Sequence, residues 1–243
     1  MGYKILKSES KLLGLNVVQV LDFEENTLIK EVDLLIEKLK PCYIFVEIPS
    51  SKLNTIHLFE TLNFQFIEFR VKAELKTELF DINPASLYPY AIKEISDKKD
   101  VKLIENYLQE NPMDDRFSTD PLLNVNKDSA KRNIYYIQKS FNSKDEFLLG
   151  VYNSYTNELI SFISGSYTSR NIAFLFQKGI LDKTSPARQE EILNILSIDF
   201  LKNRGIDYID VVSTGFNINE LNLYLNQHKF IIQSSSVILR LIA

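Results

Sequence analysis

One strand-turn-helix stretch near the C-terminal end restricts the fold of this chain more than any other segment. The apolar run Ala173–Phe176 predicts a buried strand. After a polar turn, Pro186 fits the first position of a helix, with Ser185 as its cap. Gly205 is a natural end for this helix. Between these signals, apolar residues recur at helical spacing at Ile192, Leu196 and Phe200. We therefore expect a helix that packs one face on a sheet.

The remaining pattern predicts two α/β units joined by a linker. Residues 1–76 form the smaller unit, residues 77–90 carry two prolines and no clear period, and residues 91–243 form the larger unit. In the first unit we expect strands at 17–23, 43–48 and 64–75, a helix at 27–40 and a short helix that carries Ile56, Phe59 and Leu62. In the second unit we expect strands at 91–95, 146–153, 159–168, 172–181, 207–212 and 230–242, and helices at 97–110, 127–140, 186–204 and 217–227.

Composition excludes several classes of protein. Apolar residues make up 45% of the chain, which is ordinary for a globular protein, and the net charge of −4 argues against nucleic acid or an anionic membrane as the main partner. Cys42 is the single cysteine, so a disulfide framework is excluded. His57 and His228 are isolated, so we expect no metal site. No apolar run approaches the ~18 residues of a membrane helix and no signal core opens the chain, so we expect a cytoplasmic protein.

The order of elements and the stretch after Ala173 resemble the GNAT acyltransferase superfamily. Its members carry Gln/Arg-x-x-Gly-x-Gly/Ala where the core helix begins, and main-chain N–H groups there hold the pyrophosphate of acetyl-CoA. On that pattern this chain has Arg188, but Glu191 and Leu193 replace the two small residues. The resemblance implies an α/β (α+β) GNAT fold with a mixed central sheet, preceded by a smaller half-GNAT-like domain. It also implies acetyl-CoA as co-substrate, although Glu190 and Glu191 would repel its pyrophosphate.

Two further segments narrow the resemblance. The run Asp115-Arg116-Phe117-Ser118, followed by Asp120 and Pro121, is similar to the dTDP-fucosamine acetyltransferases, as is the opening Glu9–Leu15. The segment 58–64, LFETLNF, resembles the last helix and strand of a GNAT half, with Asn63 at the left-handed position. It indicates an internal repeat.

The resemblance also assigns site residues. The main chain near Leu181, Asp182 and Lys183 would stabilise the thioester oxyanion, and Arg188 and Gln189 would face the cofactor. Tyr224 falls at the position of the general acid, or packs its ring on the sheet.

Other assignments keep an alternative. Asn217 either faces the pantetheine arm or caps its helix. His228 stands where the family has glycine, and it is either a base or, as we expect, a solvated histidine at the helix end. Arg116 and Asp120 would bind the acceptor, with Arg116 on a nucleotide-sugar phosphate, or they form a salt bridge that fixes the loop.

Three functions fit these residues. The favoured one is an N-acyltransferase that moves an acetyl group from a CoA thioester to an amine of a small molecule, with an amino sugar nucleotide as the implied acceptor and a homodimer allowed. A second is a GNAT-fold module that has lost acetyl-CoA and serves in binding or assembly. A third is a transferase whose donor is an acidic carrier protein. The side chains of Lys178, Lys183 and Arg188 would supply the basic surface that binds it.

Overall fold

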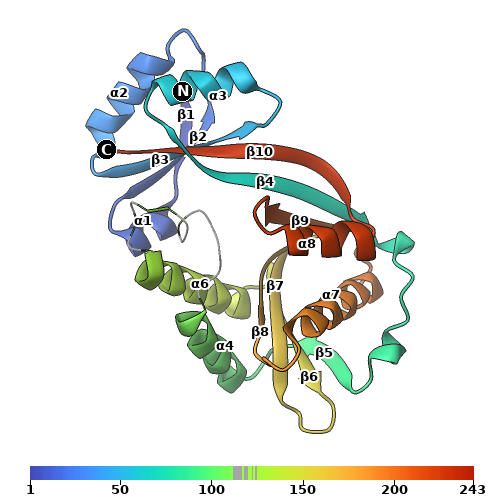
Figure 1. The fold of residues 1–243 in the computed structure, drawn as a ribbon. Helices are drawn as coiled ribbons and strands as arrows, with labels where there is room; N and C mark the ends of the chain where they lie inside the picture. The colour runs from blue at the N-terminus through green and yellow to red at the C-terminus, as the bar shows by residue number, and fades with distance from the viewer. Residues whose placement is uncertain (112–116, 118–119, 122, 124) are drawn as a thin grey trace.

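Ten strands form one continuous sheet in a computed structural model, which describes residues 1–111, 117, 120–121, 123 and 125–243. The spatial order is β1-β2-β3-β10-β4-β9-β8-β7-β6-β5 (Figure 1). The strands are β1 (Gly2–Ile5), β2 (Asn16–Asp22), β3 (Cys42–Pro49), β4 (Gln65–Lys76), β5 (Tyr90–Glu94), β6 (Glu146–Asn153), β7 (Leu159–Ser169), β8 (Ile172–Ile180), β9 (Tyr208–Thr214) and β10 (Ile231–Ile242). The pairs β2–β3 and β8–β9 are parallel and the other neighbours are antiparallel. The predicted α/β fold with a mixed central sheet is confirmed.

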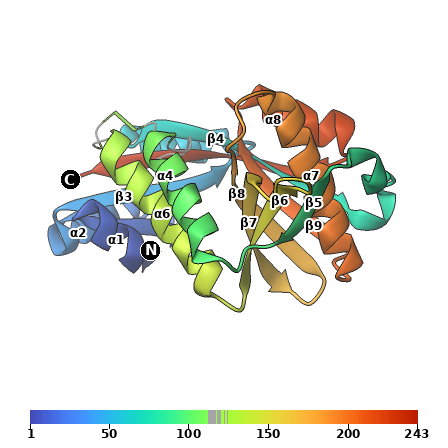
Figure 2. The same cartoon turned by 90° about the horizontal axis from the view of Figure 1, so that it is seen from below.

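Helices cover both faces of the sheet. They are α1 (Lys7–Leu13), α2 (Leu28–Leu39), α3 (Leu53–Thr61), α4 (Lys98–Glu110), α6 (Val125–Asn142), α7 (Pro186–Asn203) and α8 (Ile218–Asn222). Side chains alternate along a strand, so adjacent residues serve different cores. Phe162 of β7 packs with α4 and α6, which lie side by side in Figure 2, whereas its neighbour Ile163 packs with α7. In the first half, α2 and α3 cover one face and α1 lies toward the other.

The last strand of each half is exchanged with the other half. β10, the C-terminal strand, lies between β3 and β4, and β4 in turn pairs with β9 of the second half. Figure 1 shows the long strands β4 and β10 running together between the two groups of helices. The sheet is therefore continuous across the linker, and the division at residues 76 and 91 stays a prediction.

The two halves repeat one motif, as the segment 58–64 indicated. Each contains a parallel strand pair, β2–β3 or β8–β9, and the second strand of each pair leads into a short helix, α3 or α8. In the first half the rings of Phe59 and Phe64 pack together, with their centroids 5.0 Å apart. In the second half the rings of Tyr224 and Phe230 do the same, with centroids 4.9 Å apart. Tyr224 therefore corresponds to Phe59.

A π-helical turn (η3, Leu223–Gln227) adds one residue to the second copy. The N–H of Phe64 donates to the carbonyl of Phe59, five residues back, whereas that of Phe230 reaches Tyr224, six residues back. Asn63 has φ 64°, as predicted, but its counterpart is Lys229 with φ 61°. The alignment of His228 with the family's glycine was therefore wrong by one residue.

Most expected elements form within two or three residues of their predicted ends, with three differences. β1 and α1 were not expected, because their apolar residues are too few to show a period. The segment 77–90 contains two 3₁₀ turns, Thr77–Leu79 and Pro84–Leu87. Ser185 makes no side-chain cap; its carbonyl accepts the N–H of Gln189 instead.

Two ion pairs, one partly buried and one buried, hold distant segments to this framework. The carboxylate of Glu9 on α1 accepts Nε of Arg132 at 2.9 Å and the hydroxyl of Tyr136 at 2.7 Å, both from α6. The carboxylate of Asp120 accepts Nε of Arg240 on β10 at 2.8 Å and a second guanidinium nitrogen at 3.1 Å. The second pair joins the segment before α6 to the exchanged strand.

We expect Asp120→Ala to lower the free energy of unfolding by about 3–5 kcal/mol, because Arg240 would remain buried without its carboxylate. Urea denaturation measures the change. The control is Lys102→Ala, which breaks the exposed pair with Glu105 and should cost no more than about 0.5 kcal/mol. The double variant Asp120→Ala/Arg240→Met should be more stable than the sum of the single changes predicts. Equal costs for Asp120→Ala and Lys102→Ala would contradict the assignment.

The extra residue of the π-turn leaves His228 completely buried, so the expectation of a solvated histidine was wrong. Burial, and then the nearby ammonium of Lys178, lower the pKa of His228 to about 4. The unfolded chain takes up this proton at about pH 6.5, so the neutral form stabilises the fold above that pH and its contribution is lost as the pH falls toward 4.

We therefore expect the free energy of unfolding of the wild type to fall by about 3 kcal/mol more between pH 6.5 and pH 4 than that of His228→Leu. Denaturation curves at half-unit pH steps give the comparison. Both proteins share every other titrating group, so parallel pH profiles would show that His228 is not the source.

Candidate functional site

An opening separates β8 from β9 near the middle of the sheet. Their parallel pairing runs only from Ile172–Tyr208 to Leu175–Val211, although the strands continue to Ile180 and Thr214. Within the described residues, no ladder joins the strands beyond that point. The next residue on each strand, Phe176 and Val212, is 37% exposed. The opening is thus accessible to solvent, and apolar side chains lie at its edge.

A β-bulge at Phe176 reorients the free part of β8. Leu175 pairs with Gly165 but Gln177 pairs with Ser164, so Phe176 is an extra residue. Before the bulge Leu175 packs against α7, and after it Ile180 does so as well. Gln177 points the other way, where its Nε2 donates to Asn133 of α6 at 3.2 Å. The bulge therefore turns Lys178 toward α7.

The main chain of β8 alternates in the same manner. The N–H groups of Leu181 and Asp182 both donate to the carbonyl of Ile160, at 2.8 and 3.1 Å, so they point toward β7. In an antiparallel ladder every second residue turns its main-chain groups to the opposite side. Those of Lys178 and Ile180 therefore face the opening. They, rather than Leu181 and Asp182, are the main-chain groups that a ligand in the opening could meet.

A charged cluster lies beside the opening, centred on Lys178. Its Nζ is 2.7 Å from Oε1 of Glu190 on α7, 2.7 Å from Oε1 of Glu220 on α8 and 3.2 Å from the hydroxyl of Tyr224. Burial lowers the pKa of Lys178, but Tyr224, Glu220 and Glu190 together outweigh it, and the net shift is upward. The ammonium therefore stays charged at neutral pH. Ser213 of β9 donates to the other oxygen of Glu220.

Tyr224 packs in the core, as one of its two alternatives predicted, and its hydroxyl lies beside the opening. Its ring packs on Phe230 in the core, and the side chain is only 5% exposed. Its hydroxyl nevertheless reaches the ammonium of Lys178 next to the opening. Burial raises the pKa of Tyr224 to about 12 even though Lys178 opposes the shift. The phenol therefore keeps its proton at neutral pH.

The residues at the pyrophosphate positions do not fit that group. α7 already begins at Pro186, so the main-chain N–H groups of residues 190–193 lie inside the helix. Gln189 is buried, and its Nε2 donates to the hydroxyl of Tyr90 at 3.1 Å and to Asp182 at 3.3 Å. Leu193 is 0% exposed in the core. Glu191 is exposed, as are Lys183 and Arg188 at the start of the helix.

The other predicted site residues are placed as follows. Asn217 caps α8, where its Oδ1 accepts the N–H of Glu220 at 3.2 Å. Asp120 is fully buried and pairs with Arg240 of β10, a partner that the sequence did not indicate. Arg116, like Asp115 and Ser118 of the same motif, lies outside the described residues. His57 is exposed and pairs with Glu60.

Lys178 and Glu220 were not recognised as members of the site. Lys178 was a surface cation in the carrier-protein hypothesis. It interrupts an apolar strand, however, and this signal could have placed it beside a partly buried carboxylate. Glu220 follows Asn217 at the spacing of a capping box. That spacing explains its position without indicating its partner.

The described residues contain neither a metal-binding cluster nor a membrane-spanning helix. No group of three or more His, Cys, Asp and Glu side chains there could hold a metal ion. None of the helices in that part of the chain is both long and apolar enough to cross a membrane.

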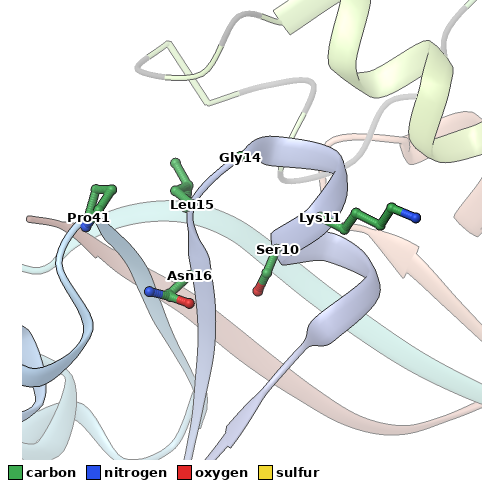
Figure 3. Close-up of a pocket in the computed structure, with 6 residues that line it drawn as sticks. All are labelled: Ser10, Lys11, Gly14, Leu15, Asn16 and Pro41. Carbon is green, nitrogen blue, oxygen red and sulfur yellow. The ribbon is translucent and has the colours of Figure 1, made fainter.

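A shallow surface pocket of about 330 Å³ lies in the first half, between α1 and the start of β2 (Figure 3). Its polar side chains serve the fold. The hydroxyl of Ser10 donates to the carbonyl of Leu6 and accepts the N–H of Val17, and Nδ2 of Asn16 donates to the carbonyl of Leu39. Lys11 and Pro41 complete the lining with two further residues. The pocket is separate from the opening between β8 and β9.

Comparison with known proteins identifies the fold but no close relative. No protein-family model matches the sequence, and no curated protein matches it. Among solved structures, a GCN5-related N-acetyltransferase from Sphaerobacter thermophilus is similar, with a TM-score of 0.64, 10% identity, and coverage of 99% of this chain and 76% of that one. A GCN5-related N-acetyltransferase from Kribbella flavida has a TM-score of 0.61, 6% identity, and coverage of 93% and 80%.

Another similar structure is a tandem GNAT protein from the clavulanic acid biosynthesis pathway. Its TM-score is 0.57 at 10% identity, and the match covers 93% of this chain and 75% of that one. At these identities the likeness establishes the fold and leaves the activity open. The chain has the fold of the GCN5-related N-acetyltransferases, in a two-part arrangement.

Proposed function

We propose that this protein is an acyltransferase that moves an acyl group from a thioester to an amine of a small molecule. The observation that carries the proposal is the opening between β8 and β9 with a protonated phenol, Tyr224, beside it. The GNAT fold supports acyl transfer as the class of reaction. An extended donor arm with amide groups would lie along β8 and hydrogen-bond with the main chain of Lys178 and Ile180.

The reaction would run as a direct displacement. The amine nitrogen attacks the thioester carbonyl carbon, the C–N bond forms, and the C–S bond breaks. Tyr224 gives its hydroxyl proton to the departing sulfur, and water takes the proton that the amine loses. The ammonium of Lys178, 3.2 Å away, stabilises the phenolate until solvent returns the proton.

The acceptor we propose is the amine of a small molecule, with an amino sugar favoured. Support comes from the sequence resemblance and from one similar structure, described as a GCN5-related glucosamine N-acetyltransferase region of a fungal protein. That match has a TM-score of 0.66 at 8% identity and covers 93% of this chain but 30% of that one. A nucleotide on the sugar, a homodimer and a cytoplasmic location stay predictions.

A binding module without catalysis is the second candidate. The observation that favours it is the ion pair between Lys178 and Glu190, which fills the space beside the opening. A protein of this kind would release no thiol from any thioester in the presence of amines.

We expect Tyr224→Phe to lower kcat for thiol release roughly 10²-fold, because the variant cannot protonate the leaving sulfur. Its melting temperature should change little, since Lys178 keeps both carboxylates. The assay uses S-acetylpantetheine as donor and glucosamine as acceptor.

The matched control for that variant is Tyr152→Phe. Tyr152 is also 5% exposed, and its hydroxyl donates to Asp100 at 2.6 Å, but it lies against α4. This control should keep full turnover. Equal kcat for wild type and Tyr224→Phe would remove Tyr224 from the mechanism.

A further inference from the structure

We propose that the donor is a pantetheine-type thioester without the adenosine diphosphate of CoA, and that Glu190 is the residue that excludes the diphosphate. This inference rests on the proposed function and names the donor class of the same site. It starts from the misfit at the beginning of α7, where the cradle of the fold family would lie.

Lys178 has no donor left for a phosphate. An ammonium has three N–H groups. Three acceptors lie within hydrogen-bond distance of Nζ, namely Glu190 at 2.7 Å, Glu220 at 2.7 Å and Tyr224 at 3.2 Å. A diphosphate could reach the ammonium only by displacing one of them, and Glu190 already occupies the place on the α7 side.

The charge of the cluster also opposes an anion. One ammonium and two carboxylates give Lys178, Glu190 and Glu220 a formal sum of −1. Glu191 adds an exposed carboxylate at the next position along α7. Like charges in a partly buried site repel more strongly than in water, because the local dielectric constant is lower.

The main chain at the start of α7 offers little compensation. A helix N-terminus binds phosphate through its free N–H groups. Here Pro186 has no N–H, and the N–H of Gln189 donates to the carbonyl of Ser185, which leaves two N–H groups in the first turn, those of Ala187 and Arg188. The residues that supply the cradle in the fold family are one turn further on, where their N–H groups are used within the helix.

The opening itself suits the remainder of the donor. Pantetheine is a narrow chain with two amide groups and a terminal sulfur. Lys178 and Ile180 turn main-chain groups toward the opening, and Phe176 and Val212 supply apolar contacts at its edge. Tyr224 is close to the strand, where the sulfur would lie.

Titration calorimetry of the wild type with pantetheine and with CoA tests the inference directly. The two thiols share the same arm and differ in the 3′-phosphorylated adenosine diphosphate. We expect CoA to bind at least 10-fold more weakly, a difference of about 1.4 kcal/mol. Tighter binding of CoA would overturn this inference and leave the proposed function standing. Absence of binding by either thiol would overturn both.

Two variants assign the exclusion to a residue. Glu190→Gln should strengthen CoA binding at least 5-fold without changing the dissociation constant of pantetheine, since it releases Lys178 and removes one charge. The matched control Glu191→Gln removes the same charge from an exposed position and should change CoA binding less than 2-fold. Equal gains in the two variants would show a general charge effect and would overturn the role of Glu190. Melting curves without ligand confirm that both variants fold.

Discussion

The antiparallel pairing of β4 with β10 is the contact on which the rest of the structure depends. Each of these strands ends one half of the chain and completes the sheet of the other half. The pairing spans Ile231–Glu74 to Arg240–Gln65, so it ties the end of the first half to the C-terminal strand. β9, which forms one edge of the opening, is held on its other side by β4. The geometry of the site in the second half thus requires a strand supplied by the first.

The charged cluster shows how a site arises from elements that are remote in sequence. Lys178 comes from β8, Glu190 from α7, Ser213 from β9, and Glu220 from α8. The bulge at Phe176 decides the side on which Lys178 appears. Without that extra residue the ammonium would point toward α6, and the two carboxylates would lack a cation. A change in the strand register therefore governs the chemistry of the cluster.

Local pattern was sufficient to predict β8, α7 and the capped start of α4, because periodicity and capping act within one turn or strand. Asp97, where the sequence pattern begins this helix, is its cap and accepts the N–H of Lys99 at 2.8 Å. The sequence pattern could not predict that β10 lies between β3 and β4. This position depends on pairing between strands that are more than 150 residues apart in the chain.

The candidate site was harder to predict than the fold. The resemblance proposed Tyr224, but it could not predict the partners of the Tyr224 hydroxyl, because these depend on how three elements meet. The π-turn could not be predicted from the sequence for a different reason. A single inserted residue leaves the apolar pattern intact, so His228 was aligned one position too early.

The internal repeat has a consequence for stoichiometry. The two copies share their strand order, their ring pairs and their left-handed residues at Asn63 and Lys229. At the position of Tyr224, however, the first copy has Phe59, which lacks a hydroxyl and is buried in an apolar core. Under the proposed function, the phenol of the duplicated scaffold would therefore lie in the second half, and each chain would turn over a single donor at a time while its first half supports the second.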